Sequence, residues 1–171
     1  TLQERGGARV THVVFMGMGE PLMNLPNVLN AIDLLHTEVG ISMRRMTIST
    51  IGITSAIRKL ARRNLQLTLA VSLHAPDVRL RRRLIPLSSR FPLPELVEAC
   101  REYAAVTKRR ITFEYLLLAG VTDSTEQAAS LARLLSGMLC HVNLIPYNEV
   151  PGKEFKRPAK KAIAAFKSAL E

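Results

Sequence analysis

The sequence predicts an α/β fold made of repeated βα units. Short apolar runs rich in Val, Ile and Phe alternate with segments of helical periodicity, which is typical of a parallel sheet with helical crossovers. The chain has 171 residues, 47% of them hydrophobic, which is enough for one compact domain with its own core. Units of about 30 residues fit this length. They are compatible with an incomplete (β/α) barrel and with an open α/β sheet, and periodicity does not separate the two.

Five stretches have the composition of strands. Parallel strands covered on both faces are continuously apolar, and the first, third and fifth stretches mostly follow this rule. They are residues 11–17 (THVVFMG), 45–50 (RMTIST), 66–74 (QLTLAVSLH), 109–118 (RRITFEYLLL) and 140–147 (CHVNLIPY).

Helices are expected between the strands, because apolar residues recur there at spacings of three and four. Ser124 and Gln127 have capping-box spacing, Gly137 lies near the end of the same helix, and Pro158 suits the first turn of the last one. The apolar stripes are Val28, Ile32 and Leu35; Ile53, Ile57, Leu60 and Ala61; Leu96, Val97, Cys100 and Tyr103; and Ile163, Phe166 and Leu170.

Residues 75–94 (APDVRLRRRLIPLSSRFPLP) are too charged and too rich in proline for a strand, so we expect a long basic loop there. Such a loop is either solvated or, at the rim of the strand ends, a place where nucleic-acid phosphates bind. Its basic cluster consists of Arg79, Arg81, Arg82, Arg83 and Arg90.

The chain is strongly basic, with a formal net charge of +10 and a pI near 10.3. This balance favours a polyanionic partner such as nucleic acid, although scattered charge on a basic enzyme would give the same total. Cys100 and Cys140 form neither a disulfide framework nor a metal-binding spacing, and we expect both to be core thiols in a reducing compartment.

No run of 18 apolar residues occurs, and residues 1–10 lack the apolar core of a signal peptide. We therefore expect a cytoplasmic protein that does not enter a membrane. The chain begins at Thr1 rather than Met and stops at Glu171 within a helical pattern, so we expect an internal piece of something longer.

The loops after the strands should form the site, because parallel strands present their carboxyl ends at one edge. Residues 17–22 (GMGEPL) begin like a dinucleotide-binding G-x-G-x-x-G motif, but the third glycine is Leu22 and a proline interrupts the turn. The carboxylate of Glu20 would repel a diphosphate and accept from an ammonium group. The alternative is a tight turn with an exposed glutamate.

Each of the other polar residues at the predicted strand ends could have either a structural or a ligand-binding role. Ser72 and His74 would point into a barrel mouth, although a lone histidine is more often structural. Ser49 could cap the next helix or donate to a ligand, and Asn148 could form a turn or bind a polar ligand.

Several motifs together resemble the RlmN/Cfr family of radical S-adenosylmethionine (SAM) RNA methyltransferases. In family order they are FMGMGEPLMN, TISTIGI, AVSLHAPD, ITFEYLLLAGVTDS and CHVNLIPYN, followed by PG and KRP. The resemblance spans nearly the whole chain and is strongest to the RlmN branch. It implies a partial (β/α)6 barrel, of which residues 1–171 would supply five units, and methyl transfer from SAM to C2 of an adenine in 23S rRNA and tRNA. The Cfr branch methylates C8 of the rRNA adenine instead.

The resemblance also implies SAM contacts at the predicted strand ends. Carried over motif by motif, these fall on Gly19, Glu20, Ser49, Ser72, Leu73, His74 and Asn148.

The family's C-x-x-x-C-x-x-C motif, which holds a [4Fe-4S] cluster, is absent from residues 1–171, since two cysteines 40 residues apart cannot supply closely placed thiolates. The resemblance places the cluster ligands upstream and the methyl-carrying cysteine downstream, so we assign no catalytic or metal-binding residue here. The expected barrel fragment would be inactive by itself, and the intact enzyme would be a monomer with an external electron donor. A non-catalytic RNA-binding module and a Rossmann-like nucleotide enzyme are the alternatives.

Overall fold

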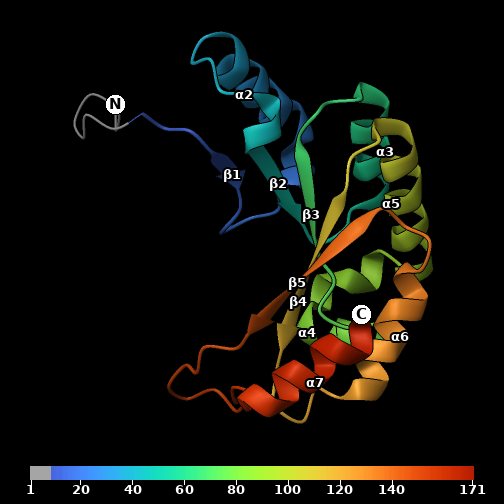
Figure 1. Cartoon of the computed structure of the whole chain (residues 1–171). Coiled ribbons are helices and arrows are strands. Elements are labelled where there is room, and N and C mark those ends of the chain that lie inside the picture. Colours follow the sequence, from blue (N-terminus) through green and yellow to red (C-terminus); the bar gives the residue numbers. More distant parts are fainter. Residues whose placement is uncertain (1–8) are drawn as a thin grey trace.

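A computed structural model of the chain describes residues 9–171 and confirms the α/β fold (Figure 1). Residues 1–8, the start of the predicted domain, lie outside the described part. Five parallel strands form one sheet in the order β1-β2-β3-β4-β5. They lie within the predicted stretches but are shorter at several ends: β1 Val13–Phe15, β2 Met46–Thr50, β3 Thr68–Ser72, β4 Ile111–Leu117 and β5 Cys140–Pro146.

The α-helices fill the intervals between the strands, as the apolar stripes predicted, with one addition. They are α2 Leu25–Thr37, α3 Thr54–Arg63, α4 Val78–Leu84, α5 Leu93–Thr107, α6 Thr125–Leu135 and α7 Lys160–Leu170, with short 3-10 turns at Pro21–Asn24, Met43–Arg45 and Pro86–Arg90. The prediction for Pro158 was slightly wrong, since α7 has Ala159 as its N-cap and the proline precedes the first turn.

The sequential strand order decides between a barrel and a doubly wound sheet. Doubly wound sheets reverse their strand order at a switch point, whereas each strand here pairs with the next along the chain. Right-handed crossovers then place successive helices on one face. In Figure 1, α3, α5 and α6 lie to the right of the sheet, and α7, at the bottom of the view, packs against α6. The architecture is therefore a partial barrel whose inner face is left free of helices.

Two central strands alternate between buried and partly exposed residues, because helices cover only one of their faces. In β4, Ile111, Phe113, Tyr115 and Leu117 are buried, while the residues between them are partly exposed. The same alternation occurs in β2. Burial on both faces, expected for the first, third and fifth stretches, occurs in β3, where Leu69, Ala70 and Val71 are all buried, but not in β1 or β5, which contain exposed residues. The polar side chains on the inner face of β2 and β4 remain accessible to solvent, which keeps their cost low.

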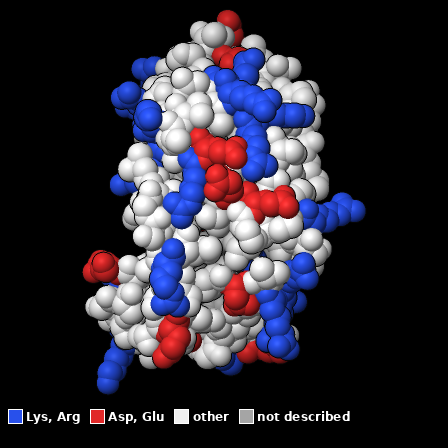
Figure 2. Space-filling model, turned by 90° about the vertical axis from the view of Figure 1, so that its right-hand side faces the viewer, with Lys and Arg blue, Asp and Glu red and all other residues white. Residues whose placement is uncertain are grey.

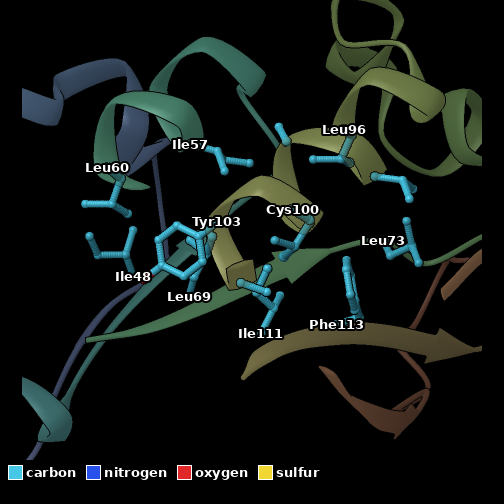
Figure 3. Close-up of a cluster of buried hydrophobic side chains, with 14 of the residues drawn as sticks. Ile48, Ile57, Leu60, Leu69, Leu73, Leu96, Cys100, Tyr103, Ile111 and Phe113 are labelled. Atoms are coloured by element: carbon cyan, nitrogen blue, oxygen red, sulfur yellow. The ribbon is translucent and has the colours of Figure 1, made fainter. Parts of the chain in front are cut away.

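The core lies between the sheet and the outer helices. Figure 3 shows side chains of α3 and α5, among them Ile57, Leu96 and Tyr103, above Leu69 and Phe113 of the sheet. Each of these five residues is fully buried, which contributes about 1.5–3 kcal/mol for an aliphatic side chain.

The two cysteines differ in burial. Cys100 belongs to this core, and burial raises the pKa of its thiol to about 12 despite the opposing charge of Arg81. Cys140 is half-buried against the core. The expected core placement is therefore confirmed for Cys100 and met in part for Cys140.

The connection 75–94 is not the loop that its charge and prolines predicted. It contains α4, whose N-cap Asp77 accepts from Leu80 N at 2.8 Å, followed by a 3-10 turn that begins at Pro86. The prolines bracket the helix rather than interrupt it, which is why the helix is allowed.

Within residues 9–171, none of the helices has the length and apolar character needed to cross a bilayer.

Gly52→Ala is expected to destabilise the fold. A Cβ there would lie 2.6 Å from Leu96 Cδ1, at a backbone φ of +105°. Gly19→Ala is the matched control, since its φ is +103° and nothing lies within 4 Å of the added Cβ. Urea unfolding should show Gly52→Ala to be less stable than the control by about 1–3 kcal/mol, the usual cost of overpacking. Equal losses would contradict the contact.

Ser124→Ala is expected to lower stability by about 1 kcal/mol, because it removes the N-cap of α6. Ser124 Oγ accepts from Gln127 N at 3.3 Å and Gln127 Oε1 accepts from Ser124 N at 3.4 Å, which confirms the predicted capping box. Ser168→Ala, at an exposed position inside α7, is the control and should change the thermal midpoint little. Similar shifts for both variants would show that the cap contributes nothing.

Candidate functional site

The corner after β1 places two glycines, and so main chain without side chains, at the end of the sheet. Gly17 and Gly19 have φ values of +116° and +103°, a region that favours glycine, and no atom lies within 4 Å of a Cβ built on either. The chain then enters the 3-10 turn at Pro21, with Glu20 as its N-cap. The broken glycine motif is therefore an open turn that ends on a carboxylate.

Backbone amides orient the Glu20 carboxylate. Its Oε1 accepts from Leu22 N at 3.1 Å, and its Oε2 accepts from Ile51 N at 2.8 Å. The second bond joins the corner after β1 to the loop after β2. Among residues 9–171, no lysine or arginine forms an ion pair with Glu20. The carboxylate is thus held in place and keeps its charge available to a cation.

A cavity of about 300 Å³ lies beside this carboxylate. It contains five of the seven residues predicted to contact SAM, and it confirms that the carboxyl ends of separate strands meet. Its lining consists of Met16, Gly17, Gly19, Glu20, Pro21, Ser49, Thr50, Ile51, Ser72, His74, Glu114 and Ile145.

His74 combines a structural role with a place in the cavity wall. Its φ is +58°, its Nδ1 accepts from Leu116 N at 3.1 Å, and its own N–H donates to Glu114 O at 3.2 Å. Burial, and then the nearby charge of Arg81, lower the pKa of its imidazole to about 4. The ring is therefore neutral at physiological pH. Because Nδ1 accepts, the ring proton is on Nε2, which makes that atom a donor.

Ser49 and Ser72 line the cavity, so Ser49 is not the cap of the following helix: α3 has Ile53 at its N-cap, without a side-chain bond. Thr50 instead holds the loop, since its Oγ1 accepts from Gly52 N at 3.0 Å. Leu73 is fully buried in the core and only its backbone is near the site.

Asn148 is exposed on the loop after β5 and lies outside the cavity lining. Its Oδ1 accepts from Arg157 Nη1 at 2.9 Å. Its contact with SAM stays a prediction, as do those of the other six residues.

A second, more apolar cavity of about 480 Å³ shares Ile51, Ser72 and His74 with the first. On its far side Tyr147 and Phe155 meet edge to face, with ring centroids 6.2 Å apart. Its remaining lining is Arg83, Leu84, Ile85, Leu116, Leu118, Val150 and Lys153.

Arg81 is not a solvated or phosphate-binding residue, as its place in the basic cluster had suggested. It is 1% exposed, and its Nη2 donates to Ile51 O at 2.5 Å and to Ser72 O at 3.3 Å. Burial lowers its pKa to about 10, so it remains charged at physiological pH. The other four arginines of the cluster are exposed. Arg81 therefore holds the loop after β2 to the end of β3, next to the cavity.

Glu114 is the functional candidate that sequence reasoning missed. It lies on the inner face of β4 and lines the cavity, and its Oε2 accepts from Asn143 Nδ2 at 2.7 Å. The signal was present in the sequence as a single carboxylate inside an otherwise apolar strand.

The described residues do not fit an iron–sulfur cluster. No group of three or more His, Cys, Asp or Glu side chains among residues 9–171 is placed to hold a metal ion. The cavity does fit a small cationic ligand, because it offers an oriented carboxylate, open glycine backbone and hydroxyl groups.

The chain is similar to RNA methyltransferases over its whole length. It is 53% identical over 171 residues to a protein of Picosynechococcus named "probable dual-specificity RNA methyltransferase RlmN", covering 100% of this chain and 49% of that protein. A protein of the same name from Gloeobacter violaceus is 51% identical over 170 residues. The chain spans about half the length of the curated relatives it matches.

Solved structures agree. A radical SAM methyltransferase from Sphaerobacter thermophilus superposes with a TM-score of 0.92 at 47% identity, covering 98% of this chain and 50% of that one. A domain of pyruvate-formate lyase-activating enzyme from Bacteroides vulgatus, at 17% identity and a TM-score of 0.71, shares the fold. The family model described as "Radical SAM superfamily" matches residues 2–132. The chain, with its carboxylate-bearing corner at the strand ends, belongs to the radical SAM superfamily.

Proposed function

We propose that this chain forms the SAM-binding barrel of an RlmN-type enzyme, which transfers a methyl group from SAM to C2 of an adenine in 23S rRNA and in tRNA. The observation that carries the proposal is the Glu20 carboxylate, fixed by two backbone amides beside open glycines at the strand ends. The identity of 53% to a named RNA methyltransferase supports the reaction class.

Two parts of SAM, the ammonium group and the adenine ring, have proposed positions in the site. The ammonium group would donate to Glu20, whose charge is not neutralised by a described cation. The adenine ring would occupy the apolar cavity between Leu116 and Tyr147, where an aromatic base can stack or pack. His74 would donate through Nε2 from the wall that the two cavities share.

SAM supplies the methyl group, and members of the radical SAM superfamily use it together with a [4Fe-4S] cluster. Residues 9–171 present no ligand set for such a cluster. The role proposed for this chain is to bind and orient SAM, while the rest of the enzyme supplies the reacting cysteine and the cluster ligands and an external protein donates the electrons.

RNA is the proposed partner, which the net charge of +10 supports. The helix-covered face does not provide a continuous basic surface: Figure 2 shows acidic side chains between the basic ones. Arg58 pairs there with Glu102 at 2.8 Å. We therefore place the RNA on the strand-end side, in the cytoplasm where rRNA and tRNA are modified.

Glu20→Gln should weaken SAM binding by about tenfold or more, because a charge-assisted hydrogen bond to the ammonium group is lost. Affinity would be measured by calorimetry on the intact, cluster-loaded protein without reductant. Glu102→Gln is the matched control, since that glutamate pairs with Arg58 on the outer helices. Unchanged affinity in Glu20→Gln would overturn the assignment of the ammonium site.

The methylated atom is tested separately. Mass spectrometry of rRNA and tRNA from cells that express the intact gene should show 2-methyladenosine. 8-Methyladenosine would assign the Cfr-type reaction instead, and unmodified RNA alongside retained RNA binding would favour a non-catalytic binding module.

A further inference from the structure

Glu114 is the second carboxylate of the cavity, and its neighbours on the adjacent strands fix its position. In the sheet register it lies beside Ser72 of β3 and Asn143 of β5, so all three side chains project from the inner face at the same level. Asn143 donates to Glu114 Oε2 at 2.7 Å. Within residues 9–171, no hydrogen bond or ion pair engages Glu114 Oε1. One oxygen is therefore oriented by a neighbour, and the other is free to accept from a ligand.

The position of Glu114 along the sheet indicates which part of a ligand it meets. The ammonium site at Glu20 follows β1, at one edge of the sheet. The apolar cavity begins at the other side, with Leu116 two residues beyond Glu114 on β4 and Tyr147 just after β5. Glu114 thus lies between the proposed sites for the amino-acid end and for the adenine.

The ribose connects those two ends in SAM. A carboxylate is well suited to it, because it accepts from neighbouring hydroxyl groups, as acidic residues do in dinucleotide-binding folds. No lysine or arginine is among the residues lining the first cavity, and His74 is neutral, so nothing described there would compete for the carboxylate.

We propose that Glu114, oriented by Asn143, accepts hydrogen bonds from the ribose hydroxyls of SAM and makes the site specific for an intact ribonucleoside. The inference rests on the proposed SAM-binding function. It assigns a separate part of the ligand from Glu20, so the two assignments predict opposite responses to a shortened ligand.

The experiment compares ligands that lack one part of SAM. 5′-Methylthioadenosine has the ribose but no amino-acid group, and its 2′,3′-dideoxy analogue lacks the hydroxyls as well. Binding of each and of SAM is measured by calorimetry on the intact, cluster-loaded protein without reductant. The variants are Glu114→Gln and Glu20→Gln, with Glu102→Gln as the control on the outer helices.

Glu114→Gln should weaken both SAM and 5′-methylthioadenosine by about tenfold, because the charged acceptor is lost. It should leave the dideoxy analogue unaffected, while Glu20→Gln should weaken SAM alone. Equal weakening of the dideoxy analogue would overturn the ribose assignment. So would weakening of SAM without weakening of the thioether, which would point to the sulfonium charge.

A measurement on the unchanged protein covers the case in which Glu114→Gln fails to fold. The protein should bind 5′-methylthioadenosine about tenfold more tightly than the dideoxy analogue, and Asn143→Ala, which releases the carboxylate, should reduce that ratio. A ratio near one would refute the inference. Failure of SAM itself to bind would refute the proposed function.

Discussion

The sequential order of the five parallel strands is the constraint on which the rest of the structure depends. It sends the crossovers to one face, so in β2 and β4 the buried residues face the helices and the alternate residues face an inner surface that helices leave free. That surface accepts hydroxyl, amide and carboxylate side chains without the cost of burying them in a core. Because the carboxyl ends of all strands point the same way, the segments after β1, β2 and β3 meet at one cavity, which Glu114 of β4 and Ile145 of β5 also line.

The electrostatics of the cavity depend on two carboxylates without paired cations and on a histidine that is kept neutral. Neither Glu20 nor Glu114 is paired with a described cation, since their described partners are backbone N–H groups and an amide. His74 is kept neutral by burial and by the guanidinium of Arg81, so it adds no positive charge to the wall. A basic protein of net charge +10 thereby contains an acidic pocket, a combination suited to holding a cationic cofactor beside a polyanionic substrate.

Much of this arrangement could be predicted from sequence, because strand composition and strand-end position are local properties. The five strands and the Gly17–Glu20 corner were found in this way, whereas the argument from the acidity of Glu20 against a phosphate loop stays a prediction. The features that the sequence did not predict depend on packing between distant segments. The burial of Arg81 follows from two carbonyls on other loops, and the inward position of Glu114 becomes meaningful only beside Asn143, which the register supplies. The separation of Asn148 from the cavity likewise depends on how its loop folds onto Arg157.

The burial of Arg81 also changes what the arginine run at 79–83 represents. Three of its arginines are exposed and contribute to the electrostatic potential at the surface. The fourth, Arg81, is buried and has a structural role, because its guanidinium donates to main-chain carbonyls. A lysine would preserve the charge at position 81 but would lack the guanidinium Nη2, the single nitrogen that donates to both carbonyl oxygens. The four arginines of this run therefore tolerate substitution differently. Replacing each in turn by a neutral residue would test long-range electrostatics at the three exposed positions and loop geometry at position 81.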